Sequence, residues 1–348
     1  MQSLVPICNR VSCESKKTNY MKKINYILIA LMTLLLAASC AQDEGMKAEN
    51  KGDEATISLS IQLPDQGPLS RAYGEAEKID HLVYQVFQLD NDGEIVSSIF
   101  HLEKDANFNP EETVILSLLK GKSYKIAFWA QKEGTGYYNT DDLRAVKVNY
   151  TAANNDDGQD AFFKTEQFTV KSDASLNVVL NRPFAQINVG VSDMDLAKAA
   201  SAGLTVTQSK AIIKNVANTI NLIDGKVSGT EDVAIYTMAP TPKEENGEEL
   251  EVTINDEEVP YNYLSMSYLL VDEEKTLLTS GLEFEFANAD GSDSVTLTQG
   301  LTNVPVQRNY RTNIIGRLLT SDIDFSIIID ELFKDEEYNE EDILVPAE

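Results

Sequence analysis

Polar and apolar residues alternate along much of the chain, which is the pattern of half-buried β-strands. Within residues 55–63 the alternate positions are apolar, namely Ile57, Leu59, Ile61 and Leu63. Further strands are expected at 81–100, 113–119, 123–131, 145–150, 161–170 and 175–181. Turn residues separate these runs and no long helical pattern interrupts them, so the first half of the chain predicts a β-sandwich.

The alternation resumes after Arg182-Pro183, which marks a predicted boundary between two domains. A helix is expected at 193–203, because that segment starts at an Asp and ends at a Gly. The later strands are expected at 184–191, 250–255, 261–271, 281–298, 303–319 and 322–330. The fold class is therefore predicted as all-β, with two tandem β-sandwich domains.

The segment 21–39 has the layout of a secretory signal: Lys22 and Lys23, then an apolar run, then small residues. The apolar run is too short to span a bilayer comfortably. Cys40 follows directly, and the sequence "LAASC" resembles the site at which lipoprotein signal peptidase cuts, after which Cys40 would carry the lipid. An ordinary secretory signal and an uncut membrane anchor are the alternatives.

Met21 with its two lysines is typical of a translation start, so residues 1–20 are interpreted as an upstream extension. The polar residues after Cys40 read as a flexible tether. Asp43 and Glu44, directly behind the cysteine, resemble the surface-export signal of lipoproteins in Bacteroidota-type bacteria. The expected segments are the extension 1–20, the signal peptide 21–39, the tether 40–54, the N-terminal sandwich 55–183, the C-terminal sandwich 184–333 and an acidic tail 334–348.

Acidic residues dominate the exported part of the chain. From Cys40 onward, 24 basic side chains stand against 55 acidic ones, a net charge near −31. Such a field repels nucleic acid and anionic lipid headgroups, so neither is expected as a partner through a basic patch. Cys40 is the only cysteine in this part, so no disulfide framework is available and the domains must be held by their cores.

Residues that carry catalytic or metal chemistry are scarce. The exported part has two histidines, His81 and His101, and both lie at the ends of predicted strands. No zinc-hydrolase, nucleophile-elbow, paired-cysteine or phosphate-loop motif occurs. The stretch "DNDGE" at 90–94 resembles a calcium loop, but a hairpin turn explains its Asp-Gly as well. We expect no metal, no cofactor and no enzymatic activity; a carboxylate-based glycosidase is the remaining enzymatic alternative.

Aromatic residues offer a second class of function. Trp129 is the only tryptophan and lies near Tyr137 and Tyr138 in sequence. Exposed together, the three rings would form a platform on which a sugar stacks, as in a surface glycan-binding lipoprotein that does not polymerise. Because strand alternation must bury either Phe128 or Trp129, core packing is the competing interpretation.

Several motifs together resemble the fimbrillin family, the major and accessory subunits of type V pili and their lipoprotein relatives. These are the signal with Cys40, "LSRAYG" at 69–74 ahead of "IDHLVYQVF", "YKIAFWAQ" at 124–131, "DAFF" at 160–163, "LNRPFAQINV" at 180–189 and "NVPVQRNYRTNIIGRLLT" at 303–320. The resemblance implies two transthyretin-like sandwiches and a structural role in a fimbria. It also implies a location at the outer membrane and cell surface, held by the lipid on Cys40.

The resemblance further implies that an arginine-specific protease cuts the precursor after an arginine near the end of the first strand. The matching residue is Arg71, since no other arginine lies between Cys40 and the first hairpin. Cutting there would free the first strand to leave its sandwich, and other subunits would fill the gap by donor-strand exchange. Ile343, Leu344 and Val345 near the C-terminus are the candidate donor residues, and the alternating strand 322–330 is a weaker candidate.

Overall fold

The structure is a computed structural model of the 348-residue chain. It describes residues 53–64, 78–104, 111–150, 157–237, 244–245, 248–249, 251–254, 257–278, 282–288, 290–297, 301–320, 324–331 and 343–344. These residues all belong to one compact unit, Asp53–Glu348. They form an all-β sandwich fold, as the alternation predicts, with one α-helix among the described residues.

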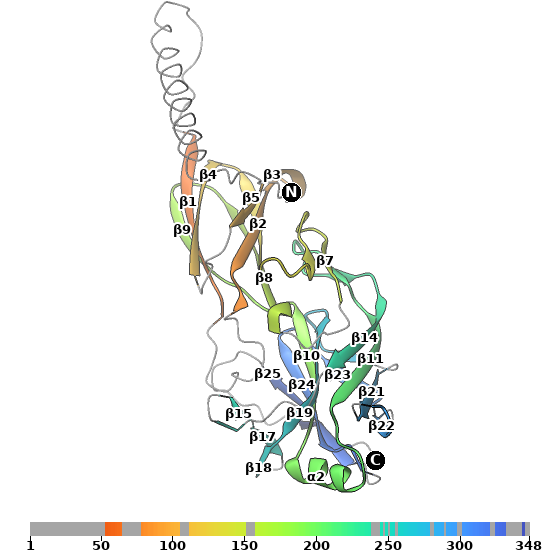
Figure 1. Cartoon of the computed structure of the whole chain (residues 1–348). Helices are drawn as coiled ribbons and strands as arrows, with labels where there is room; N and C mark the ends of the chain where they lie inside the picture. Colours follow the sequence, from red (N-terminus) through yellow and green to blue (C-terminus); the bar gives the residue numbers. More distant parts are fainter. Residues whose placement is uncertain are drawn as a thin grey trace, which may run out of the picture. The chain divides into compact units, whose positions relative to one another are not determined.

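Two sheets enclose the first hydrophobic core (Figure 1). One has the strand order β4-β1-β9 and the other β3-β2-β5-β8. The strands are β1 Glu54–Gln62, β2 His81–Leu89, β3 Ile95–Lys104, β4 Glu111–Leu119, β5 Ser123–Gln131, β8 Ala161–Thr169 and β9 Ala174–Val179. Side chains from both sheets, such as Leu59, Leu82 and Phe128, form one buried cluster. This is the face-to-face packing of a β-sandwich.

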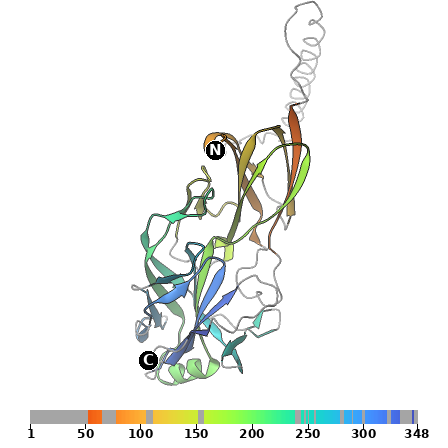
Figure 2. The same cartoon turned by 180° about the vertical axis from the view of Figure 1, so that it is seen from behind.

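A second pair of sheets follows in the chain (Figure 2). Their strand orders are β19-β10-β24-β25-β26 and β14-β11-β21-β22. The strands are β10 Phe184–Val191, β11 Gln208–Val216, β14 Glu231–Thr237, β19 Asn262–Leu270, β21 Leu282–Ala287, β22 Ser294–Leu297, β24 Tyr310–Arg317, β25 Asp324–Glu331 and β26 Ile343–Leu344. Ile187, Phe284 and Ile314 lie in a separate buried cluster formed by these strands.

A further sheet of short strands joins the two halves of the chain. Its order is β13-β12-β7-β6, and Lys147 pairs with Thr219 within it. The strands are β6 Tyr138–Asn139, β7 Val146–Val148, β12 Thr219–Ile220 and β13 Val227–Ser228. A third buried cluster contains Phe87, Trp129 and Tyr268, and so also crosses the predicted boundary. That boundary, between residues 183 and 184, stays a prediction.

The helix α2, Asp193–Ser201, confirms the expected helix at 193–203. Its N-cap is Ser192, whose hydroxyl accepts the backbone N–H of Asp195 at 3.2 Å. Gly203 follows the helix with φ +103°, a conformation that favours glycine. The predicted start at Asp193 is therefore confirmed, and the capping serine lies one residue before it.

Short pieces complete the described chain. Two short hairpins pair β15 Glu244–Glu245 with β16 Glu248–Glu249 and β17 Glu251–Ile254 with β18 Glu257–Pro260. A further two-stranded sheet pairs β20 Thr276–Leu278 with β23 Val304–Val306. A 3-10 helix spans Asp157–Gln159. Among the described residues, no helix has the length and apolarity needed to cross a membrane.

Candidate functional site

The candidate site is the slot that β1 occupies between β4 and β9 (Figure 1). β1 runs antiparallel to β4, with Ile57 opposite Leu116, and parallel to β9, with Leu59 opposite Leu176. The first strand of the chain is therefore central in its sheet, and both of its edges are hydrogen-bonded to neighbours. Removing it would leave a gap with an unpaired strand on each side.

Apolar side chains hold β1 in this slot. Ile57, Leu59 and Ile61 are buried, with at most 1% of each exposed. They belong to the same cluster as Val114 and Val178 from the two neighbouring strands. Leu63 lies just beyond the end of β1 and is only partly buried, although it packs against the same cluster. The predicted inward face is thus confirmed at three positions and is weaker at the fourth.

The outer face of β1 carries hydroxyl and amide groups that make only surface contacts. The Ser60 hydroxyl donates to the Glu111 carboxylate, and hydrogen bonds from Ser60 and Gln62 lower the pKa of that carboxyl. At the other end, the Ser117 hydroxyl of β4 donates to Glu54 at 2.5 Å. Exposed contacts of this kind contribute little to stability, so the inner face supplies most of what retains β1.

The predicted processing residues lie outside the described residues. Cys40 belongs to the segment before Asp53, and Arg71 falls between Pro64 and Lys78. Lipidation and cleavage at these two positions therefore stay predictions.

The candidate donor residues are described in part. Ile343 and Leu344 form β26, which pairs antiparallel with β25 so that Leu344 lies opposite Ile327. Val345 lies outside the described residues. The weaker candidate, residues 322–330, contains most of β25, which pairs along its length with β24 of its own sheet. Within the described chain, β25 is thus an integral strand and β26 is the short strand at its outer side.

A buried ion pair ties the first pair of sheets to the start of β10. The Arg182 guanidinium contacts the Asp160 carboxylate at 2.6 Å, and the two side chains are 1% and 0% exposed. The same guanidinium lies 4.6 Å from the ring centre of Phe162. Asp160 and Arg182 come from two of the motifs that carry the family resemblance, but nothing in the sequence indicates that they form a pair. Their separation of 22 residues leaves no local pattern that would reveal the contact.

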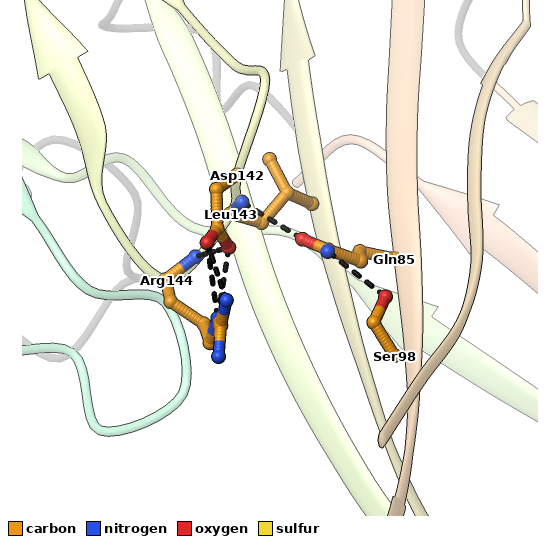
Figure 3. Close-up of polar contacts among 5 residues, drawn as sticks. All are labelled: Gln85, Ser98, Asp142, Leu143 and Arg144. Atoms are coloured by element: carbon orange, nitrogen blue, oxygen red, sulfur yellow. Dashed lines mark hydrogen bonds and ion pairs between the residues drawn. The ribbon is translucent and has the colours of Figure 1, made fainter.

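A second polar contact that the sequence did not reveal holds the loop between β6 and β7 (Figure 3). Gln85 of β2 accepts the backbone N–H of Leu143 at 2.9 Å and donates to the Ser98 hydroxyl at 3.1 Å. Arg144 folds onto Asp142, with a shortest distance of 2.7 Å, and this lowers the pKa of the Asp142 carboxyl. Gln85 is buried within an otherwise apolar run, and a glutamine in such a run is the signal that could have indicated a polar anchor.

The remaining sequence candidates have structural roles. Asp90 closes the turn between β2 and β3, since its side-chain oxygen accepts the backbone N–H groups of Asp92 and Glu94, each at 2.9 Å. The hairpin interpretation of this stretch is therefore confirmed. His81 is buried at the start of β2, and the described residues contain no cluster of side chains that could hold a metal ion.

Trp129 lies in the core, as one of its two interpretations predicted. Its side chain is 0% exposed and packs edge-on against Tyr138, with 5.1 Å between the ring centres. Tyr138 is itself 9% exposed. The suggested sugar platform lacks its central ring, because Trp129 could contact a sugar only by leaving the core.

A family model matches residues 48–346 of the chain. The chain belongs to the family of unknown function DUF6562. No match was found among proteins with curated descriptions.

Similar solved structures include two fimbrial proteins. The tip fimbrial protein Mfa3 from Porphyromonas gingivalis, with a C-terminal truncation, is 12% identical; the match covers 80% of this chain and 99% of that one, with a TM-score of 0.45. A fimbrial assembly protein from Parabacteroides distasonis is 11% identical; the match covers 79% of this chain and 96% of that one, with a TM-score of 0.39.

Proposed function

We propose that this DUF6562 protein is a non-enzymatic subunit of a surface fimbria, exported as an outer-membrane lipoprotein and polymerised by protease-triggered donor-strand exchange. The observation that carries the proposal is the position of β1, a central strand whose buried side chains alternate along one face. A strand placed in this way leaves, on removal, a slot that another extended apolar segment can fill.

Burial of apolar side chains favours refilling the slot once β1 has left it. Burial of Ile57, Leu59 and Ile61 contributes at most about 4.5–9 kcal/mol, taking about 1.5–3 kcal/mol for each side chain. The facing edges of β4 and β9 would also lose their backbone partners. A donor strand would restore the apolar contacts and both ladders, whereas a strand added at an ordinary sheet edge restores only one.

Cleavage after Arg71 would have two effects at once. It would break the covalent link between β1 and β2, so that only non-covalent contacts retain β1. It would also separate Cys40, and any lipid on it, from residues 72–348. The processed subunit would then depend on its assembly partners for attachment to the cell surface.

The donor in this proposal is the C-terminal segment with Ile343, Leu344 and Val345. Because Ile343 and Leu344 pair with β25 in the single chain, they must leave that position before they can enter another subunit. Within the described residues, the paired segment is two residues long, so few of the backbone hydrogen bonds described there oppose its release.

The test is limited proteolysis of the full chain with an arginine-specific protease. We expect a cut after Arg71, identified by the new N-terminus at Ala72, followed by ladders of oligomers on non-denaturing gels. The variant R71A should stay uncut at this position and monomeric. The variant R144A is the matched control, because it removes an exposed arginine elsewhere and should polymerise like the wild type. Wild-type protein that is cut but remains monomeric, or R71A protein that polymerises, would contradict the proposal.

A further inference from the structure

Two apolar side chains flank β1 on the outer face of its sheet. Ile115 of β4 is 68% exposed, more than any other large apolar side chain among the described residues, and Val179 of β9 is 46% exposed. Ile115 lies opposite Ser58, and Val179 lies opposite Gln62. Because their neighbours in β1 are polar, both apolar side chains stay uncovered. Ile115 and Val179 together form the outer rim of the slot.

β1 fits the slot on its inner face only. Its outward residues are all polar: Glu54, Thr56, Ser58, Ser60 and Gln62. A strand that is apolar on both faces would keep the buried contacts and also cover the outer rim, since opposite side chains on one face of a sheet pack against each other. The outer rim thus matches an occupant that differs from β1.

The segment 343–347 is apolar on both faces. Its sequence is "ILVPA", and in an extended strand residues 343, 345 and 347 share one face while residues 344 and 346 share the other. The segment contains the donor residues named above. A strand that only fills the inner face would not need Leu344 to be apolar, whereas a strand that covers the outer rim does.

One register brings both faces of this segment into contact with the slot. If the segment runs in the direction of β1 and Ile343 takes the place of Ile57, then Leu344 takes the place of Ser58, opposite Ile115. Residues 345 and 347 then take the next two buried places of β1, at 59 and 61.

Registers that keep Leu344 outward but are shifted by two residues are less favourable. A shift in one direction places Glu341 at the position of Ile57, which is 1% exposed, and burial of an unpaired carboxylate is costly. A shift in the other direction places Ala347 at the position of Leu59, which is 0% exposed. The smaller side chain would leave a cavity there.

The position of Ser58 is close enough to Ile115 for direct side-chain contact. The Gln62 carbonyl accepts the Leu180 N–H at 2.9 Å, just beyond the end of β9. Backbone groups alternate in direction along a strand, so the backbone groups of Ser58 also face β9. Ser58 and Ile115 are therefore a pair without mutual backbone hydrogen bonds, the kind in which the two side chains lie closest.

Pro346 would take the position of Ser60 in this register. It has no N–H, so the ladder with β9 would lack one hydrogen bond at that position. Its apolar ring would lie diagonally across from both Ile115 and Val179, within the reach of cross-strand contacts. The outward residues Leu344 and Pro346 would thus cover the outer rim together.

We propose that Ile115 selects the incoming strand, by packing against Leu344 of a second copy of this chain. The proposal rests on the strand exchange proposed above and adds the register and a residue that favours one donor over others.

Disulfide cross-linking tests the register. The three native cysteines, Cys8, Cys13 and Cys40, all precede Arg71, so the trimmed chain carries only the cysteines that are introduced. Full chains with I115C and with L344C are mixed, cut with the arginine-specific protease, freed of the released fragment and oxidised. We expect a disulfide-linked dimer on non-reducing gels, with the linked peptides identified by mass spectrometry.

Two controls accompany the cross-linking. The variant S117C places a cysteine two residues along the same exposed face of β4, and it should link to L344C about tenfold less than I115C does. The variant I328C tests β25 as the donor instead, and it should not link to I115C.

The change I115S tests the selection itself. It should raise the subunit concentration needed for polymerisation about two- to fivefold, because one apolar cross-strand pair is lost. The melting temperature of the uncut chain should not change, since the Ile115 side chain is exposed there. The matched control is V96S, which removes an apolar side chain that is 58% exposed on β3, away from the slot. It should polymerise like the wild type.

Four results would overturn the proposal while strand exchange still stands. They are polymers without the link between I115C and L344C, equal linking of S117C, preferential linking of I328C, and polymerisation of I115S at the wild-type concentration. A cut chain that forms no polymers would instead contradict strand exchange itself, and the selection by Ile115 with it.

Discussion

The strands β1 and β10 occupy equivalent places in their sheets but are held there in different ways. Each is a central strand with one antiparallel and one parallel neighbour: β4 and β9 flank β1, while β19 and β24 flank β10. All eight residues of β10 are buried, on both faces. β1 is buried on one face only. Equivalent topology therefore does not make the two strands equally replaceable.

The second face of β10 carries specific polar contacts. The Asn188 amide donates to Asn313 Oδ1 at 2.9 Å and to Gln186 Oε1 at 3.2 Å, and all three residues are at most 2% exposed. A buried network of this kind accepts only the residues that complete it. β1 needs alternate apolar side chains and little else, and a different segment can provide those. In the proposed assembly, a different amphipathic strand can therefore replace β1, whereas β10 is fixed by its own sequence.

The largest effect should come from the ion pair just before β10. The change R182M leaves the Asp160 carboxylate buried without its partner and should cost about 3–5 kcal/mol of unfolding free energy, measured by urea denaturation. The control R144M removes the arginine of the exposed pair with Asp142 and should cost within about 1 kcal/mol. Similar losses in the two variants would show that the start of β10 is not specially fixed.

Cavity-forming substitutions in β1 and β10 should distinguish the stability of the uncut chain from the retention of the β1 fragment after cleavage. Leu59 and Ile187 are each 0% exposed, so L59A and I187A should each lower the unfolding free energy of the uncut chain by about 2–5 kcal/mol. After cleavage at Arg71, only L59A should weaken retention of the β1 fragment, measured by size-exclusion chromatography with mass spectrometry. If I187A released the fragment equally, β1 would not be held chiefly by its own apolar side chains.

The smallest effects should come from polar side chains on the second face of each strand. The change N188A removes the donor to two buried oxygens and should cost about 1–3 kcal/mol. The change S60A removes an exposed hydrogen bond on β1 and should stay within about 0.5 kcal/mol. Thermal denaturation followed by circular dichroism measures both, and an equal cost would remove the contrast between the two strands.

Local periodicity predicted individual elements well. The strand expected at 184–191 coincides with β10, and that expected at 55–63 differs from β1 by one residue at each end. Leu63 is less buried than the alternation predicted. The reason is that β1 ends at Gln62, so the next residue is no longer held by hydrogen bonds to the neighbouring strands. The alternation of polar and apolar residues is a property of neighbouring positions, so it can be read from the sequence of a single strand.

Pairing between distant segments was not predictable in the same way. Nothing near Leu59 indicates that β9, more than a hundred residues away, lies beside it in parallel. The same holds for Lys147 beside Thr219 and for the Asp160–Arg182 pair. These contacts depend on which faces the sheets bury against each other, and a single sequence does not record that choice. The sequence therefore predicted β1 as a half-buried strand but did not predict its central place in the sheet.

The mixed directions of the two strands beside β1 set a polarity. A segment that replaces β1 and keeps its hydrogen-bond pattern must run antiparallel to β4 and parallel to β9. A segment inserted in the opposite direction would need a different hydrogen-bond pattern with both β4 and β9. Each subunit would then receive its neighbour in one orientation, head to tail, and a head-to-tail contact that does not close on itself propagates as an open fibre with two unlike ends.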